Sequence, residues 1–144
     1  GPKLWFLIHT ISYCSPKSLS EIEQRDYYLF FSYIIPKCVP CPECIIHYIK
    51  LTNKYKFHGK TRDDLINYTI LLHNKVNKRL KKQILERQEI DLLYNNKYKY
   101  INEIYVLLKW MQGNIKYNII SKRDFQTLLI WLTKLLPSVT KLNN

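Results

Sequence analysis

The scarcity of residues that make tight turns restricts the fold of this chain more than any other feature of its sequence. The 144 residues include three Gly and six Pro, whereas a fold of many short strands needs such residues at frequent intervals. Apolar residues instead recur at the three- and four-residue spacing of a helix face. We therefore predict an all-α fold, with no long strand and no internal repeat.

Seven segments of the chain carry apolar residues at helical spacing. Three capping boxes are expected at helix starts: Ser18 with Glu21, Thr61 with Asp64, and Ser121 with Asp124. Pro42 suits the first turn of a third helix, where its missing N–H costs nothing. The predicted helices cover residues 3–14, 18–35, 41–51, 60–86, 86–94, 101–112 and 121–136, and the helix over 60–86 is expected to be the longest.

The chain has a formal net charge of +12, which favours acidic partners, phosphates or anionic surfaces without naming one. An AT-rich coding sequence would produce the same excess of Lys, Asn, Ile and Tyr. A basic helical bundle that binds nucleic acid is an alternative, but we expect no nucleic-acid partner. The longest apolar run, residues 27–35, is far shorter than the roughly 20 residues of a membrane-spanning helix. We expect no membrane span and no secretory signal.

The stretch VPCPECIIHY, residues 39–48, places Cys41 and Cys44 at the expected start of a helix. Backbone N–H groups and the helix dipole stabilise a thiolate there, and this spacing allows a small, reducible disulfide ring. A metal or iron–sulfur site is the alternative, with four candidate ligands at three-residue spacing: Cys38, Cys41, Cys44 and His47. Such ligands would fan out around one helix. Spacing alone leaves redox chemistry, metal binding and coincidence open.

Two further motifs contain aromatic or imidazole side chains. The stretch HNKVNKRLKK, residues 73–82, puts an imidazole, two carboxamides and a basic tail on adjoining faces of one helix. That combination suits a planar, polar ligand that carries phosphate. Trp5 and His9 lie four residues apart, where the two rings could enclose a ring system. Each motif taken alone has an ordinary explanation, as a solvated polar side chain or a core Trp.

In this order and spacing, the three motifs resemble the Erv/ALR family of FAD-dependent sulfhydryl oxidases over residues 1–94. The composition looks most like the versions of large cytoplasmic DNA viruses. The resemblance implies a four-helix bundle with a short fifth helix, a homodimer, and FAD as cofactor. Residues 95–144 exceed the family core. They are expected to form a C-terminal helical extension that packs on the core or serves as an interaction surface, with a boundary at Asn95 and Asn96.

The resemblance also implies roles for individual residues. Cys44 would be the flavin-proximal sulfur, and Cys41 the outer sulfur that meets the incoming thiol. Tyr94 would stack on the adenine. Lys78 and Arg79 are candidate pyrophosphate contacts, and a solvated helix face explains them equally well. The full set expected to bind FAD is Trp5, His9, Tyr13, His47, His73, Asn74, Val76, Asn77, Lys82 and Tyr94.

The implied reaction takes electrons from substrate dithiols through the Cys41–Cys44 disulfide to FAD and then to oxygen, giving hydrogen peroxide. The implied partner is a small dithiol or thioredoxin-like substrate protein. The implied location is intracellular, in the host cytoplasm (the viral factory) or the virion, with the mitochondrial intermembrane space as an alternative. The family's usual Gly is replaced by Lys81. Cys14 and Cys38 are expected to be packed thiols, not a shuttle pair.

Overall fold

The computed structural model describes residues 2–94, 97–117 and 120–136 of the chain, and the predicted boundary at Asn95 and Asn96 lies outside them. The described residues form helices and no strand, which confirms the all-α prediction. α6 has 20 residues and α4 has 18, so the prediction that the helix over 60–86 is the longest was wrong. The helices are α1 (Pro2–Tyr13), α2 (Glu21–Leu29), α3 (Pro42–Lys54), α4 (Arg62–Arg79), α5 (Arg87–Tyr94), α6 (Lys97–Lys116) and α7 (Lys122–Leu135).

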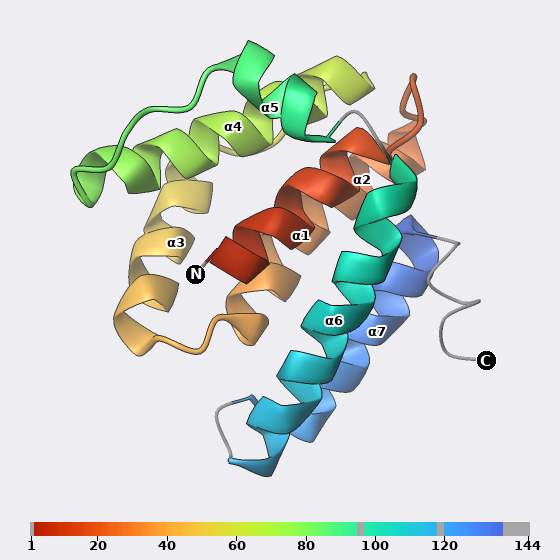
Figure 1. Cartoon of the computed structure of the whole chain (residues 1–144). Coiled ribbons are helices and arrows are strands. Elements are labelled where there is room, and N and C mark those ends of the chain that lie inside the picture. Colours follow the sequence, from red (N-terminus) through yellow and green to blue (C-terminus); the bar gives the residue numbers. More distant parts are fainter. Residues whose placement is uncertain (1, 95–96, 118–119, 137–144) are drawn as a thin grey trace.

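α1 is the central helix of the arrangement (Figure 1). α4 packs along it, and the short α5 also contacts it. α3 lies at one end of the bundle and packs on α4. α6 and α7 lie side by side as an antiparallel pair on the other side of α1 (Figure 1). Among the described helices, none combines the length and apolar content that crossing a bilayer requires.

The N-cap of the second helix lies two residues later than predicted. Ser20, not Ser18, forms the capping box: the Glu23 N–H donates to Ser20 Oγ (3.2 Å), and the Ser20 N–H donates to Glu23 Oε1 (2.9 Å). Both Ser18 and Ser20 have a Glu three residues later. Ser18 is held in an isolated β-bridge with Thr61, which keeps its backbone extended. The backbone contact between Ser18 and Thr61 therefore determines which of the two equivalent Ser–Glu pairs caps the helix.

α2 continues into a π-helical turn, η1 (Phe30–Ile34), and a 3₁₀ turn, η2 (Ile35–Cys38). The hydroxyl of Tyr48, a buried residue of α3, donates to the Phe31 carbonyl at 2.7 Å. A π-helical turn shifts the backbone hydrogen-bonding pattern of a helix. This bond gives a buried carbonyl of the turn a partner and joins the turn to α3.

α4 ends at Arg79, seven residues before the predicted end at Glu86. The Lys82 N–H donates to the Asn77 carbonyl (2.8 Å), and the Lys81 N–H donates to the carbonyl of Lys78 (3.2 Å). These two bonds form a Schellman motif, the usual way for a helix to end. Lys81 has φ 57°, the left-handed conformation that normally selects Gly.

Two hydrophobic clusters hold the helices together. The main cluster joins α1, η1, α3 and α4 to the inner faces of α6 and α7, which include Ile104, Leu108, Met111, Leu128 and Leu132. The second cluster contains Ile66 and Ile70 of α4 with Ile90 and Tyr94 of α5. α5 is thus attached through its own small cluster. The division of the chain at residue 94 stays a prediction.

Candidate functional site

The dithiol lies at the start of α3. Cys41 is the N-cap, and its Sγ accepts a hydrogen bond from the Cys44 N–H at 3.4 Å, while Pro42 occupies the first turn. Cys41 is half-buried and Cys44 is exposed. Hydrogen bonds from the Cys44 thiol and N–H lower the pKa of Cys41, and the hydrogen bond with Cys41 raises the pKa of Cys44. The arrangement therefore favours a thiolate on Cys41.

Cys38 and His47 do not join the dithiol. Cys38 is buried, its thiol contacts the Ile34 carbonyl (3.6 Å), and burial raises its pKa to about 12. His47 faces Glu43, with 3.9 Å between Nε2 and Oε1. Within the described ranges, no three His, Cys, Asp or Glu side chains are placed to hold a metal ion. The alternative of a metal site built from the three cysteines and His47 is therefore wrong for this geometry.

A cluster of rings forms where α1, α4 and α5 meet. Trp5 stacks on His73, with ring centroids 4.2 Å apart and planes 2° apart. His9 Nε2 and His73 Nδ1 are 2.8 Å apart, so one imidazole donates an N–H to the other. Tyr94 lies 5.5 Å from the His9 ring and 5.3 Å from the Tyr13 ring. The structure thus brings together five residues that the sequence assigned to one site, although Trp5 stacks on His73 and not on His9.

Both imidazoles of the ring cluster are neutral at pH 7. Burial, and then the neighbouring His73, lower the pKa of His9 to about 3. Burial, and then the charge of Lys82, lower the pKa of His73 to about 4. His9 Nδ1 is buried, with no hydrogen-bond partner among the described residues. The ring cluster therefore contains one buried nitrogen, His9 Nδ1, that makes no hydrogen bond with the described residues.

Asn74 and Asn77 hold the loop that follows α4. Asn74 Nδ2 donates to the Leu85 carbonyl (2.8 Å), and the Leu85 N–H donates to Asn74 Oδ1 (2.7 Å). Asn77 Nδ2 donates to the Gln83 carbonyl (3.2 Å). Val76 between them is half-buried. The two carboxamides thus fix loop backbone, a function that the sequence pattern did not indicate.

Arg87 of α5 is a residue that the sequence analysis missed. Its guanidinium donates to Asp91 (2.8 Å), Asn67 (2.8 Å) and Asp63 (2.8 Å). Tyr13 of α1 donates its hydroxyl to the same Asp91 at 2.6 Å. This network joins α5 to α4 and α1. The one sequence signal for it is the spacing of Arg87 and Asp91, an i, i+4 pair on a helix.

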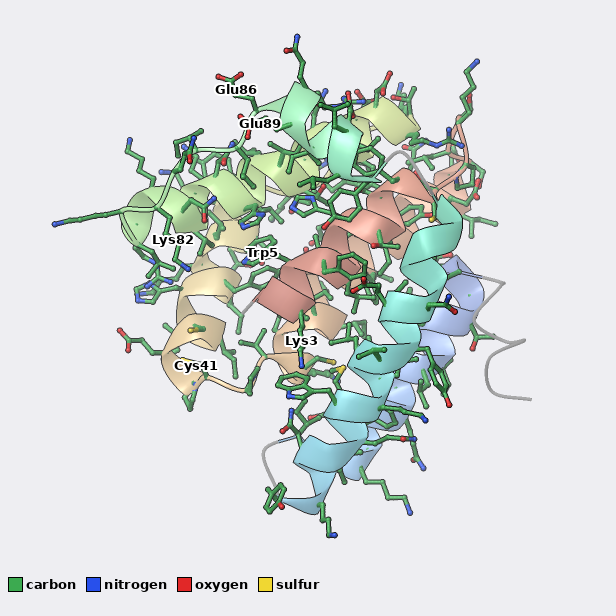
Figure 2. The ribbon with its side chains drawn as sticks, viewed as in Figure 1. Lys3, Trp5, Cys41, Lys82, Glu86 and Glu89 are labelled. Atoms are coloured by element: carbon green, nitrogen blue, oxygen red, sulfur yellow. The ribbon has the colours of Figure 1, made fainter. Side chains whose placement is uncertain are left out.

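The end of α4 presents a run of cations. Lys78, Arg79, Lys81 and Lys82 are all exposed, and no ion pair joins any of them to another described residue. Figure 2 shows Lys82 just past the end of α4 and Cys41 at the start of α3, on the same side of the molecule. The hydrogen bond with Cys41 raises the pKa of Cys44, whereas the Arg79 charge lowers it. Of the four cations, Arg79 is thus the one whose charge affects the pKa of the dithiol.

Comparisons with known proteins agree with this geometry. A sequence profile of the Erv1 / Alr family matches residues 2–99. The FAD-linked sulfhydryl oxidase ERV2 of Saccharomyces cerevisiae is 30% identical over 86 residues, which cover 60% of this chain and 43% of the yeast protein. A probable FAD-linked sulfhydryl oxidase of Acanthamoeba polyphaga mimivirus is 31% identical over 91 residues, which cover 59% of this chain and 61% of the viral protein. A putative FAD-linked sulfhydryl oxidase of Frog virus 3 is 27% identical over 97 residues, which cover 65% of this chain and 65% of the viral protein.

The aligned region thus covers less than two thirds of each of these relatives. Among solved structures, the yeast Erv1 core matches with a TM-score of 0.58 and 22% identity, over 62% of this chain and 75% of that one. A cysteine-to-serine mutant of Erv1 from Saccharomyces cerevisiae matches with the same TM-score, 21% identity and the same coverage. These matches confirm the predicted helical fold.

Proposed function

This chain belongs to the Erv1 / Alr family, and on that premise we propose that it is an FAD-linked sulfhydryl oxidase that forms disulfide bonds in a partner protein. The observation that supports this most directly is the placement of a Cys-x-x-Cys pair at the start of α3, which packs on the helix that carries His73. Similar relatives in yeast and in two large DNA viruses are named as FAD-linked sulfhydryl oxidases.

The side chains of the ring cluster support FAD as the ligand of this proposal. Two neutral imidazoles and an unpartnered buried nitrogen, His9 Nδ1, offer hydrogen bonds in an apolar setting. Trp5, His73 and Tyr94 add ring faces for stacking. Lys82, whose charge reaches His73, offers a cation for the pyrophosphate. The wider binding set adds Tyr13, His47, Asn74, Val76 and Asn77.

The cysteines would act in a fixed order. In the oxidised enzyme, a substrate thiolate attacks the sulfur of Cys41, the Cys41–Cys44 bond breaks, and Cys44 leaves as a thiolate. A second substrate thiolate then attacks the substrate's own sulfur in the mixed disulfide, and Cys41 leaves. The Cys44 N–H donates to Cys41 Sγ and the pKa of Cys41 is lowered, which favours Cys41 as the leaving group in this second step. The raised pKa of Cys44 and its greater exposure do not favour the first step, so the order of attack rests on the family resemblance.

Bound FAD supplies the two-electron chemistry that takes electrons from the reduced cysteine pair to oxygen. Cys38 takes no part in this proposal, because its buried thiol stays protonated. The substrate class, a small dithiol or thioredoxin-like protein, and a homodimer are further parts of the proposal. So is a location in the host cytoplasm or virion, which the two viral relatives support.

The test is the visible absorbance spectrum of the purified protein, before and after a dithiol is added in air. A flavin spectrum that bleaches and recovers while oxygen is consumed supports the oxidase. The Cys44→Ser variant should keep the flavin and lose turnover, whereas the matched variant Cys38→Ser should keep both. A protein without flavin, or a Cys44→Ser variant with full turnover, would refute the proposal.

A further inference from the structure

We propose that Asp91 is a positioning residue: its carboxylate holds Tyr13 against Tyr94 and thereby sets the preference of the flavin site for FAD over FMN. The inference rests on the proposed function and adds a residue that acts through two aromatic side chains. FMN shares the isoalloxazine and one phosphate with FAD but lacks the adenylate. A wall of the site that contacts the adenylate would therefore distinguish the two flavins, because specificity is a difference of affinities.

The first support is the geometry around the carboxylate. One oxygen, Asp91 Oδ1, accepts the Tyr13 hydroxyl at 2.6 Å and the Arg87 Nε–H at 2.8 Å. The hydrogen bond from Tyr13 lowers the pKa of Asp91, while burial and then the bond to Asp91 raise the pKa of Tyr13. At pH 7 a phenol therefore donates to a carboxylate, and a hydrogen bond to an ionised acceptor is stronger than a neutral one. Such a bond fixes the rotation of the Tyr13 ring.

The second support is the set of rings that Tyr13 faces. The Tyr13 ring stacks on Tyr94, with centroids 5.3 Å and planes 24° apart. Tyr94 is buried, and its ring lies 5.5 Å from the His9 ring and 5.7 Å from the Phe6 ring. A shift of the Tyr13 ring would therefore move the ring of Tyr94, because close-packed side chains leave little free space between them.

The third support is the length of the ring cluster. Trp5 and Tyr13 are about two turns apart on α1, which is roughly 12 Å along the helix axis. Trp5 lies on the side of α1 that faces α3 (Figure 2), the helix that carries the dithiol, whereas Tyr13 and Tyr94 lie where α1 meets α5. FAD can supply redox chemistry to the dithiol only when its isoalloxazine lies near the two cysteines. The adenylate, at the other end of the dinucleotide, would then reach Tyr13 and Tyr94.

Attachment of α5 to the bundle does not by itself account for Asp91. The Arg87 guanidinium also donates to Asp63 and Asn67 of α4, both at 2.8 Å. Ile90 of α5 packs against α4 in the second hydrophobic cluster. These contacts all join α5 to α4, whereas the hydrogen bond from Tyr13 to Asp91 runs to the central helix α1. This bond therefore orients the aromatic wall where α5 meets α1.

The experiment measures the affinities for FAD and FMN side by side. The full chain, freed of flavin by dialysis against potassium bromide, is titrated with each flavin, and bound flavin is followed by fluorescence anisotropy. We expect the wild type to bind FAD about tenfold more tightly than FMN, because the adenine gains a stacked aromatic contact. Asp91→Ala should lower the affinity for FAD about tenfold, the size expected for loss of one hydrogen bond to a charged group. The affinity for FMN should stay the same.

Two further variants separate this role from a general loss of stability. Tyr13→Phe keeps the ring and removes only the hydroxyl, so it should reproduce the loss of FAD affinity, and it carries the test if Asp91→Ala does not fold. Because both changes break the same bond, the double variant should lose no more than Asp91→Ala alone. The matched control is Asp63→Ala, which removes the other carboxylate that Arg87 contacts at 2.8 Å. This control should keep the preference for FAD.

Three results would overturn the positioning role. They are no preference for FAD in the wild type, an equal loss of FAD and FMN affinity in the Asp91 and Tyr13 variants, or the same loss of preference in Asp63→Ala. Each of them leaves the proposed thiol oxidase intact as long as the wild type carries flavin and oxidises a dithiol. If the wild type binds neither flavin, the proposed function fails, and this inference fails with it.

Discussion

Replacing Lys81 with Gly should stabilise the folded protein. Lys81 holds φ 57° at the end of α4, and a side chain in this conformation costs about 1–2 kcal/mol. Gly removes that cost but adds flexibility to the unfolded chain, which offsets about 0.5–1 kcal/mol of the gain. The net expectation is a gain of roughly 0.5–1 kcal/mol in the free energy of unfolding. Both backbone hydrogen bonds of the turn remain available to Gly.

The matched control is Lys78→Gly, the same chemical change three residues earlier, inside α4. There the backbone is right-handed, so Gly should destabilise by roughly 0.5–1 kcal/mol. An unfolding entropy of about 2.1 cal/mol/K per residue gives the 144-residue chain about 0.3 kcal/mol/K. The two variants should therefore shift Tm in opposite directions, by about 2–3 °C each.

The assay is differential scanning calorimetry at matched protein concentration, with and without saturating FAD. The order of Tm values should be Lys81→Gly, wild type, Lys78→Gly in both conditions. A Lys81→Gly variant with an unchanged or lower Tm would refute the assignment of a strained left-handed lysine.

Three other perturbations test separate parts of the structure. The folded pKa values of His9 and His73, about 3 and about 4, lie below the unfolded value of 6.5. The unfolded state therefore binds protons first, and the free energy of unfolding should fall as pH drops from about 6.5 toward 4. Urea titrations over this range should show a shallower fall for His73→Gln than for the wild type, and equal slopes would contradict the prediction. Burial raises the pKa of Cys38 to about 12, so iodoacetamide at pH 8 should alkylate this thiol only after unfolding, as followed by mass spectrometry; rapid alkylation of the native protein would exclude the buried placement. Arg87→Met removes three hydrogen bonds of one guanidinium that hold α5, and with it Tyr94, at the ring cluster. Loss of about 1 kcal/mol of stabilisation should raise the rate of FAD release several-fold. Lys134→Met, which breaks a single ion pair of α7, should leave that rate unchanged.

Caps and periodicity were enough to predict the number and type of the helices. The Thr61–Asp64 box and Pro42 in the first turn are where the sequence placed them. Elsewhere tertiary contacts overrode local signals: the β-bridge at Ser18 moved the start of α2 to Ser20. The end of α4 could not be predicted because no Gly marks it, and Lys81 takes the conformation instead.

The candidate site was predictable in its residue types and less so in its contacts. Motif spacing pointed to Trp5, His9 and His73, and the structure places their rings in one cluster, while their role in binding FAD stays a prediction. It could not show that Asn74 binds the backbone of Leu85, because a carboxamide suits a ligand and a loop equally well. The bonds from Arg87 to Asn67 and Asp63 join residues 20 and 24 positions apart, and no local sequence pattern encodes them.

The separate cluster beneath α5 gives this helix its own unfolding equilibrium. Ile90 and Tyr94 pack on Ile66 and Ile70, outside the main cluster that joins α1 to α6 and α7. α5 has only eight residues and is held by this small cluster, the Arg87 network and the ring contacts of Tyr94. Such a short helix opens at a lower free energy than the whole domain. Amide hydrogens of α5 should therefore exchange with solvent through local opening, while those of α1 and α4 wait for global unfolding. If FAD binds at the ring cluster as proposed, it would leave and return through this opening without the bundle coming apart.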